Sequence, residues 1–344
     1  MKSFLRRVGH FGLGAFFFTV MFLIVDTLLV PRNSAVKRPA AYARSFYWSE
    51  AFDKESSNLV DLISVRNTSL GYVRTMTDFD GRYINVVGGL RRTEPVPADS
   101  ARRIVAFGGS TTFCGEVPDA LTWPSQLARR VLDSEIEVIN AGSSGATFAD
   151  RVKAFGGLGL TNSDDIAIFF VGVNDAVIGS QTNQVVGPLA RWPRLRRLIE
   201  VTLSWSNLGR IALDRSQLLS FAITETSTEA VDRFRQTLHR AEVAALANNV
   251  RLLIILQPNR LMANPSTWGT PSEGVDQKFI ESFRDFYRLV IDSPEFEGRI
   301  VDGTRIFNSL NDSPYLDFVH VLEDGNEAIA SFMYAELESR GWLK

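Results

Sequence analysis

Short apolar runs alternate with amphipathic segments from about residue 101 to the end of the chain. Five of the apolar runs have the length and the β-branched content of buried strands. They are Arg103–Phe107, Glu135–Asn140, Asp165–Val171, Arg251–Gln257 and Arg299–Asp302. Because strands that are apolar on both faces alternate here with helical segments, the pattern predicts a parallel five-stranded sheet that is covered by helices on both sides.

The segments between these runs predict helices with recognisable starts. Thr122 is placed as the N-cap of a helix over Thr122–Asp133, in which Pro124 is tolerated because it falls in the first turn. A long helix over Thr226–Asn249 opens with a capping box. Two further helices are expected over Val275–Asp292 and Glu323–Arg340.

The amino-terminal segment has a different pattern, an apolar run from Val8 to Val30 without any charge between Phe11 and Val25. Its 23 residues would span about 34 Å as a helix, enough for the hydrocarbon layer of a bilayer. The run is longer than the apolar part of a cleaved signal peptide, and the A-x-A tripeptide Ala41–Ala43 lies well beyond it. We therefore expect one transmembrane signal anchor, with a short basic head in the cytoplasm and the remainder exported.

Three regions follow from these patterns. Residues 1–31 form the cytoplasmic head and the anchor, residues 32–100 a linker and a β-rich lead-in with a hairpin around Phe79–Asn85, and residues 101–344 the α/β domain. The alternation breaks at about 177–224, which predicts a helical insertion. Its arginines and tryptophans either shape the substrate cleft beside Asn174 and Asp175 or belong to a surface helical pair whose arginines are solvated.

Composition excludes several classes of function. The 344 residues include 37 basic and 39 acidic side chains, a net charge of −2, which gives no support for a nucleic-acid partner. Cys114 is the only cysteine, so an intrachain disulfide and a multi-cysteine metal site are impossible, and we expect no metal and no cofactor. The three histidines are His10, His239 and His320.

Residues with catalytic chemistry follow the predicted strands. Ser110 comes after the first strand, Gly145 after the second and Asn174 after the third. In an open parallel sheet these positions meet at one edge, where ligands bind. Ser110 offers a hydroxyl nucleophile, while its own N–H, the N–H of Gly145 and the amide of Asn174 are candidate donors for an oxyanion.

The base is selected by elimination. His10 falls in the predicted anchor and His239 in a long amphipathic helix, where an exposed or core role is expected. This leaves His320, with Asp317 three residues before it to orient the ring and stabilise the imidazolium. Cys114 is predicted to pack rather than react, because no second histidine is available to activate it.

Together, these segments resemble the SGNH hydrolase family, also called GDSL esterases. The resemblance covers about Arg103–Gly341 and implies a three-layer α/β/α fold of the flavodoxin-like kind. It places Ser110 in the first block as nucleophile, Gly145 in the second, Asn174 with Asp175 in the third, and Asp317 with His320 in the last. The lead-in, the Gly-Gly-Ser-Thr-Thr-Phe segment and the Thr-Trp-Pro helix start resemble a bacterial exported branch of the family.

The first block departs from the family pattern. It reads Gly-Gly-Ser-Thr where the family has Gly-Asp-Ser-Leu, but the missing aspartate is not a member of the triad. The α/β-hydrolase alternative fits poorly, because Thr112 occupies the last glycine position of a G-x-S-x-G elbow.

The sequence thus predicts a serine esterase that removes acyl groups, foremost acetyl, from an extracytoplasmic glycan, a cell-envelope ester or another small ester. A single-pass protein of the inner membrane is expected, with its catalytic domain in the periplasm or outside the cell and with envelope polysaccharide machinery as a candidate partner. An O-acyltransferase that uses the same triad is one alternative, and a non-catalytic glycan-binding or assembly protein is another.

Overall fold

The structure, a computed structural model, describes residues 42–43, 45–59, 63–68, 71–180, 185–186, 220–221, 226–263 and 277–344. The chain divides into two compact units, residues 1–37 with 181–224 and residues 38–180 with 225–344. The predicted anchor at residues 8–30 and the arginine-rich part of the predicted insertion lie outside the described residues. Of the helices that are described, none is long and apolar enough to cross a bilayer.

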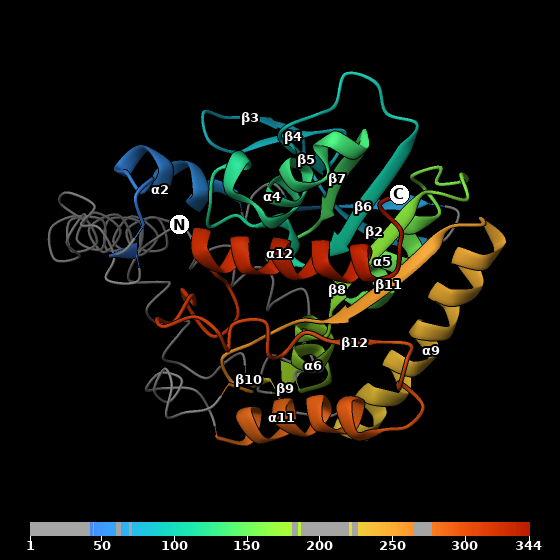
Figure 1. The fold of residues 1–344 in the computed structure, drawn as a ribbon. Helices are drawn as coiled ribbons and strands as arrows, with labels where there is room; N and C mark the ends of the chain where they lie inside the picture. The colour runs from blue at the N-terminus through green and yellow to red at the C-terminus, as the bar shows by residue number, and fades with distance from the viewer. Residues whose placement is uncertain are drawn as a thin grey trace, which may run out of the picture. The chain divides into compact units, whose positions relative to one another are not determined.

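Five parallel strands form the larger part of the main sheet, in the order β12-β11-β8-β6-β7 (Figure 1). All five were predicted, with their ends shifted by one or two residues. Their bounds are β6 Arg102–Gly108, β7 Ile136–Gly142, β8 Ile166–Val171, β11 Arg251–Leu256 and β12 Val301–Asp302.

The prediction of a purely parallel five-stranded sheet was wrong, because the sheet has eight strands and is mixed. Three antiparallel strands from the lead-in extend it beyond β7, and they include the predicted hairpin around Phe79–Asn85. They are β3 Phe79–Asp80, β4 Asn85–Val87 and β5 Leu90–Arg91. Runs of two or three residues are too short to show an alternating pattern in the sequence.

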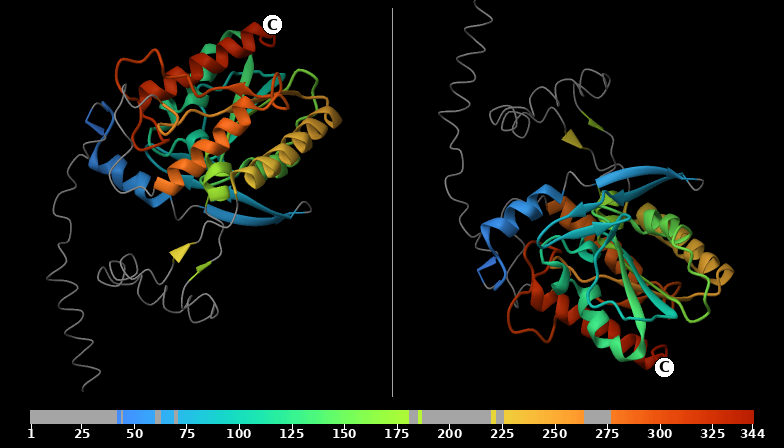
Figure 2. Two further views of the ribbon diagram at one scale, coloured as in Figure 1. Left: turned by 90° about the horizontal axis from the view of Figure 1, so that it is seen from below. Right: turned by 90° about the horizontal axis from the view of Figure 1, so that it is seen from above.

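Helices cover both faces of the sheet, as predicted, which gives the three layers. Along β6, Val105 and Phe107 face one apolar core while Ile104 and Ala106 face the other, as the alternation of a strand requires. Helices α5, α6, α9 and α11 pack on the first face, and α4 and α12 on the second (Figures 1 and 2). Their bounds are α4 Trp123–Arg130, α5 Phe148–Phe155, α6 Val173–Ser180, α9 Ser227–Ala247, α11 Gln277–Asp292 and α12 Glu323–Ser339.

The predicted helix starts are confirmed. Thr122 caps α4 by accepting a hydrogen bond from the backbone N–H of Ser125. Thr226 and Glu229 form the capping box at the start of α9. The short helices that complete the second unit are α2 Glu50–Ser57, α3 Ser110–Phe113, η3 Asp119–Leu121 and η4 Leu132–Ser134.

The lead-in packs directly on the segment that follows Ser110. A third apolar core combines Phe52 of α2, Met76 and Ile84 with Phe113 of α3. Two further hairpins complete the described strands: β1 Ile63–Thr68 pairs with β2 Gly71–Met76, and in the other unit β9 Val185–Val186 pairs with β10 Ser220–Phe221. Part of the lead-in is therefore built into the sheet and core that carry the predicted site.

Candidate active site

The predicted nucleophile lies at the sharp turn from β6 into α3. Gly109 is the N-cap of α3 and Ser110 its first residue. A Cβ atom at Gly109 would lie only 2.3 Å from Nδ2 of Asn174 and 3.3 Å from the carbonyl oxygen of Ala146. Only glycine allows this close approach, which brings the loop after β7 and the first turn of α6 against the start of α3.

Ser110, His320 and Asp317 form one chain of hydrogen bonds. Ser110 Oγ lies 2.7 Å from Nε2 of His320, and Nδ1 of the same ring lies 2.6 Å from Oδ2 of Asp317. Because a carboxylate only accepts, Nδ1 carries the ring proton, so Nε2 of the neutral ring accepts from the serine hydroxyl. The structure therefore brings together all three residues that the sequence predicted for the triad, in the order that nucleophilic catalysis requires.

Asp317 and His320 lie three residues apart in a tight loop that is closed by hydrogen bonds. The second oxygen of Asp317, Oδ1, accepts from the backbone N–H groups of Val319 at 2.7 Å and His320 at 2.8 Å. The N–H of Leu316 donates to the carbonyl oxygen of His320 at 2.7 Å. One carboxylate thus fixes both the backbone and the ring of the base.

The three predicted oxyanion donors border the same turn. Gly145 has a φ of +68°, in the left-handed region that favours glycine, and Ala146 follows it. Nδ2 of Asn174 donates to the carbonyl oxygen of Ala146 at 2.8 Å, which leaves its second N–H for a ligand. Within the described part of the chain, the N–H groups of Ser110 and Gly145 donate to no protein acceptor. The geometry is thus compatible with an oxyanion hole made of these three residues.

Asp175 has a structural role beside the site. Its buried carboxylate accepts from the backbone N–H of Phe148, at 3.1 and 3.2 Å to its two oxygens, and so caps the start of α5. Burial, only partly offset by this N–H, raises the pKa of Asp175 to about 6. It ties the first turn of α6 to the start of α5, which explains why an aspartate follows Asn174.

The electrostatics of His320 involve a residue that the sequence did not single out. Glu116, six positions after Ser110, places Oε1 at 3.6 Å from Nε2 of His320. Burial alone would lower the pKa of His320, but the charges of Glu116 and Asp317 outweigh it and raise that pKa to about 9. Burial of Asp317 is likewise outweighed, by its hydrogen bonds and the charge of His320, so its pKa lies below the usual range.

These pKa shifts predict an alkaline activity profile. Only neutral His320 can accept the serine proton, and its population grows as the pH rises toward a pKa of about 9. We expect kcat/KM for an uncharged ester to rise about tenfold per pH unit below that value and to level off above it. A pH–rate profile of the free enzyme measures this. An acid limb at the ordinary histidine pKa of about 6.5 would contradict the assigned environment of His320.

The segment after Ser110 is held by hydrogen bonds from five side chains. Every backbone carbonyl from residue 111 to residue 117 accepts a side-chain hydrogen bond. The donors, in the order of these carbonyls, are Trp123 Nε1, Asn140 Nδ2, Arg91 Nη1 for residues 113 and 114, Ser56 Oγ, Tyr47 Oη and Arg91 Nη2. Such complete pairing fixes the backbone that carries both the nucleophile and Glu116.

Arg91 makes the largest share of these contacts, and sequence reasoning missed it. Its guanidinium is fully buried, and its Nε donates to Oδ1 of Asp119 at 2.6 Å. A single arginine in a lead-in of weak periodicity gives no signal in one sequence. Two residues that the sequence analysis assigned no catalytic role, Cys114 and His239, lie as predicted. Cys114 is buried in the second core, and His239 is exposed on α9.

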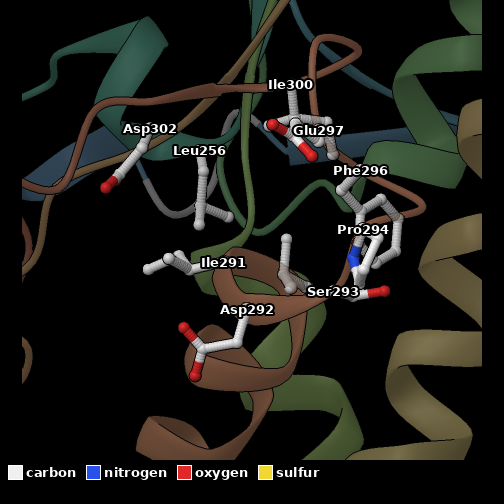
Figure 3. Close-up of a pocket in the computed structure, with 10 residues that line it drawn as sticks. Leu256, Ile291, Asp292, Ser293, Pro294, Phe296, Glu297, Ile300 and Asp302 are labelled. Carbon is white, nitrogen blue, oxygen red and sulfur yellow. The ribbon is translucent and has the colours of Figure 1, made fainter.

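A cavity of about 280 Å³ lies elsewhere, at the end of α11, and none of its lining residues was predicted for the site. Its carboxylates, from Asp292, Glu297 and Asp302, point in different directions and do not converge on one point (Figure 3). No group of three or more potential metal ligands occurs among the described residues.

Comparisons with known proteins were made at three levels. No family model matches the chain, and no curated protein does. Among solved structures, the acetyl xylan esterase AlAXEase is 16% identical with a TM-score of 0.41, over 68% of this chain and 99% of that one. A putative lipolytic protein of the G-D-S-L family from Desulfitobacterium hafniense DCB-2 is 17% identical with a TM-score of 0.35, over 68% and 98%.

A catalytic mutant of the acetylxylan esterase Axe2 from Geobacillus stearothermophilus is also similar, with 14% identity and a TM-score of 0.41 over 69% of this chain and 94% of that one. The chain is thus similar in structure to two acetyl xylan esterases and to a putative lipolytic protein of the G-D-S-L family.

Proposed function

We propose that the chain is a serine ester hydrolase of the SGNH type, with Ser110 as nucleophile, His320 as base and Asp317 as the carboxylate that orients the base. The observation that carries this proposal is the continuous hydrogen-bonded chain from Asp317 through His320 to Ser110. A protein that only bound a glycan would have no use for a hydroxyl within hydrogen-bond distance of an oriented imidazole.

The geometry supports a two-step reaction. Nε2 of His320 takes the proton of Ser110 as Oγ attacks the acyl carbon, and the imidazolium then gives this proton to the leaving alkoxide as the carbon–oxygen bond of the ester breaks. Water attacks the resulting acyl-serine with the same base, and the carboxylic acid leaves. Asp317 stabilises the imidazolium in both steps, and no cofactor or metal takes part in this scheme.

Asn174 is assigned to the oxyanion that forms in both steps. Replacing it by Ala should lower kcat by about 10²–10³ with little change in KM, because this donor acts on charge that develops only in the transition state. Steady-state kinetics with a small aryl acetate measure the effect. Asn162→Ala is the matched control, since its Nδ2 also donates to one backbone carbonyl, that of Ala101 at 2.9 Å, and it should keep the wild-type kcat. A change in KM alone would remove Asn174 from this role.

The substrate and the location are also proposals. Acyl esters of an extracytoplasmic glycan or of the cell envelope, with acetyl as the first acyl group to test, suit an enzyme whose predicted anchor at residues 8–30 leaves the catalytic unit outside the cytoplasmic membrane. The near-neutral net charge of −2 is compatible with an uncharged glycan as partner.

The deciding experiment offers the purified full-length chain an aryl acetate and an O-acetylated polysaccharide, with and without an unacetylated glycan acceptor. We expect free acetate from both esters, independent of the acceptor. Transfer of acetyl to the acceptor without release of acetate would favour an O-acyltransferase. No turnover and no labelling by a serine-directed phosphonate would favour a binding protein.

A further inference from the structure

The reaction scheme above leaves one carboxylate beside the reacting atoms unused. Oε1 of Glu116 lies 3.6 Å from Nε2 of His320, on the nitrogen that faces Ser110, whereas Asp317 binds the opposite nitrogen. Only 18% of the Glu116 side chain is exposed. The imidazole therefore has a carboxylate at each of its two nitrogens, and only the one at Nδ1 is needed to orient the ring.

The backbone of Glu116 is fixed from the side of the lead-in. Its own carbonyl oxygen accepts from Tyr47 Oη at 2.5 Å, and the carbonyls on either side accept from Ser56 Oγ at 2.8 Å and from Arg91 Nη2 at 2.8 Å. Cys114 turns the chain into this position with a φ of +57°. Such anchoring holds the carboxylate near Nε2 instead of leaving it on a free surface loop.

The position of Glu116 suits the second step of the reaction, the deacylation of Ser110. Once Ser110 carries an acyl group, its Oγ has no proton to donate, and Nε2 accepts instead from the attacking hydroxyl, at about 2.8 Å. Two acceptors that lie 3.6 Å apart, as Nε2 and Oε1 do, can both be within hydrogen-bond distance of one oxygen atom. Water has two O–H groups to give them, whereas an alcohol or a sugar hydroxyl has one.

We propose that Glu116 accepts the second O–H of the attacking water in the acyl-enzyme, and so selects water over an alcohol as the acyl acceptor. This inference rests on the proposed ester hydrolysis. Under it, Glu116 makes the acyl-enzyme react with water, which is hydrolysis, and not with an alcohol, which would be acyl transfer. In the step, the water oxygen bonds to the acyl carbon while one of its protons moves to Nε2. The bond from that carbon to Ser110 Oγ then breaks, Oγ takes the proton from Nε2, and the acid leaves with the proton that faced Glu116.

An alcohol in the place of the attacking water would interact unfavourably with the carboxylate of Glu116. Its single proton goes to Nε2, so the lone pairs of its oxygen face the negative Oε1 and Glu116 is left without a donor. A partly buried acceptor that loses its donor is costly, which is how a site built for one hydrogen-bond pattern rejects another.

The test measures the competition between water and methanol for the same acyl-enzyme. Wild type, Glu116→Gln and Glu116→Ala are given an aryl acetate with added methanol, and the yields of acetate and methyl acetate are compared. We expect the ratio of acetate to methyl acetate to fall roughly tenfold in Glu116→Ala, the size expected for the loss of one hydrogen bond to a charged group, and to fall less in Glu116→Gln, whose amide oxygen still accepts but carries no charge. Both acceptors use His320 as base, so the ratio does not depend on the pKa of His320 or on the amount of active enzyme.

Acetylated Ser110 should also accumulate during turnover in both variants, which intact-protein mass spectrometry detects, because deacylation by water is slowed. Glu297→Gln, an exposed carboxylate away from the triad, is the control and should keep the wild-type ratio. An unchanged or higher ratio in the Glu116→Ala variant, which has no acceptor at this position, would overturn the inference while leaving the ester hydrolysis intact. A wild-type chain that turns over no ester would overturn the proposed function itself, and the two failures are thereby distinguished.

Discussion

Replacing Ser110 by Ala should abolish ester hydrolysis, with a fall in kcat of roughly 10⁴-fold or more, the loss seen when a triad nucleophile is removed. The variant should fold normally, because the one described contact of the Ser110 hydroxyl is Nε2 of His320 and the turn is held by backbone and neighbouring side chains. Hydrolysis of an aryl acetate and labelling by a serine-directed phosphonate are the two measurements.

Cys114 supplies the control for this variant. It is four residues from Ser110, but its thiol is buried, contacts Asn326 Oδ1 at 3.2 Å, and has a pKa raised far above the usual range by burial. Cys114→Ala should therefore keep phosphonate labelling and most of the activity. Labelling that persists in Ser110→Ala and disappears in Cys114→Ala would assign the nucleophile to the thiol instead.

The proximity of Ser110, Asp317 and His320 was predictable because each of these residues is tied to a local feature of the sequence. Ser110 directly follows a buried strand, so its place at the carboxyl edge of the sheet is set by the fold class. The three-residue spacing of Asp317 and His320 is enough for one carboxylate to bind both the ring and the backbone of the same loop. Asn174 required one further condition, a glycine at position 109 that leaves room for its amide.

Glu116 and Arg91 were not predictable, for a different physical reason. Glu116 follows no strand, and the turn at 114–116 that contains it has no signature in the sequence. Its distance from His320 depends on a segment that is fixed by residues far away in the sequence. Arg91 lies in the two-residue strand β5, whose pairing with β7 rests on the single register Arg91–Asn140. Contacts between segments without a periodic pattern are decided by tertiary packing, which propensity does not encode.

The three short strands that extend the sheet were also not predictable from a sequence pattern. Strands β3, β4 and β5 carry two or three residues each, so the polar and apolar alternation that identifies a strand has no length over which to appear. Only the Asp80–Gly81 turn indicated a hairpin, and it did not reveal that the hairpin would join the parallel strands through β7. The lead-in thereby gains a function that its sequence did not suggest, the support of the segment between the nucleophile and Glu116.

Because Arg91 holds the segment between Ser110 and Glu116, we expect a large loss of stability when Arg91 is replaced by Ala. The guanidinium is completely buried and pairs with Asp119, whose side chain is 6% exposed, while its remaining N–H groups satisfy the carbonyls of Phe113, Cys114 and Val117. Its removal leaves a buried carboxylate without its cation and three carbonyls without this donor. We expect the free energy of unfolding to fall by about 3–5 kcal/mol, as for other buried ion pairs that lose one partner.

Arg92 is the matched control, since it is the next residue along the chain and also pairs with a carboxylate, Glu94, but with 57% and 39% of the two side chains exposed. Arg92→Ala should change the free energy of unfolding by less than about 1 kcal/mol, because exposed ion pairs contribute little. Denaturant unfolding of the two variants under the same conditions measures the difference. Equal, small losses would show that the carbonyls of residues 113–117 do not depend on Arg91. We expect instead that Arg91→Ala also loses esterase activity at temperatures where it is still folded, because the loop that carries Ser110 and Glu116 is no longer fixed.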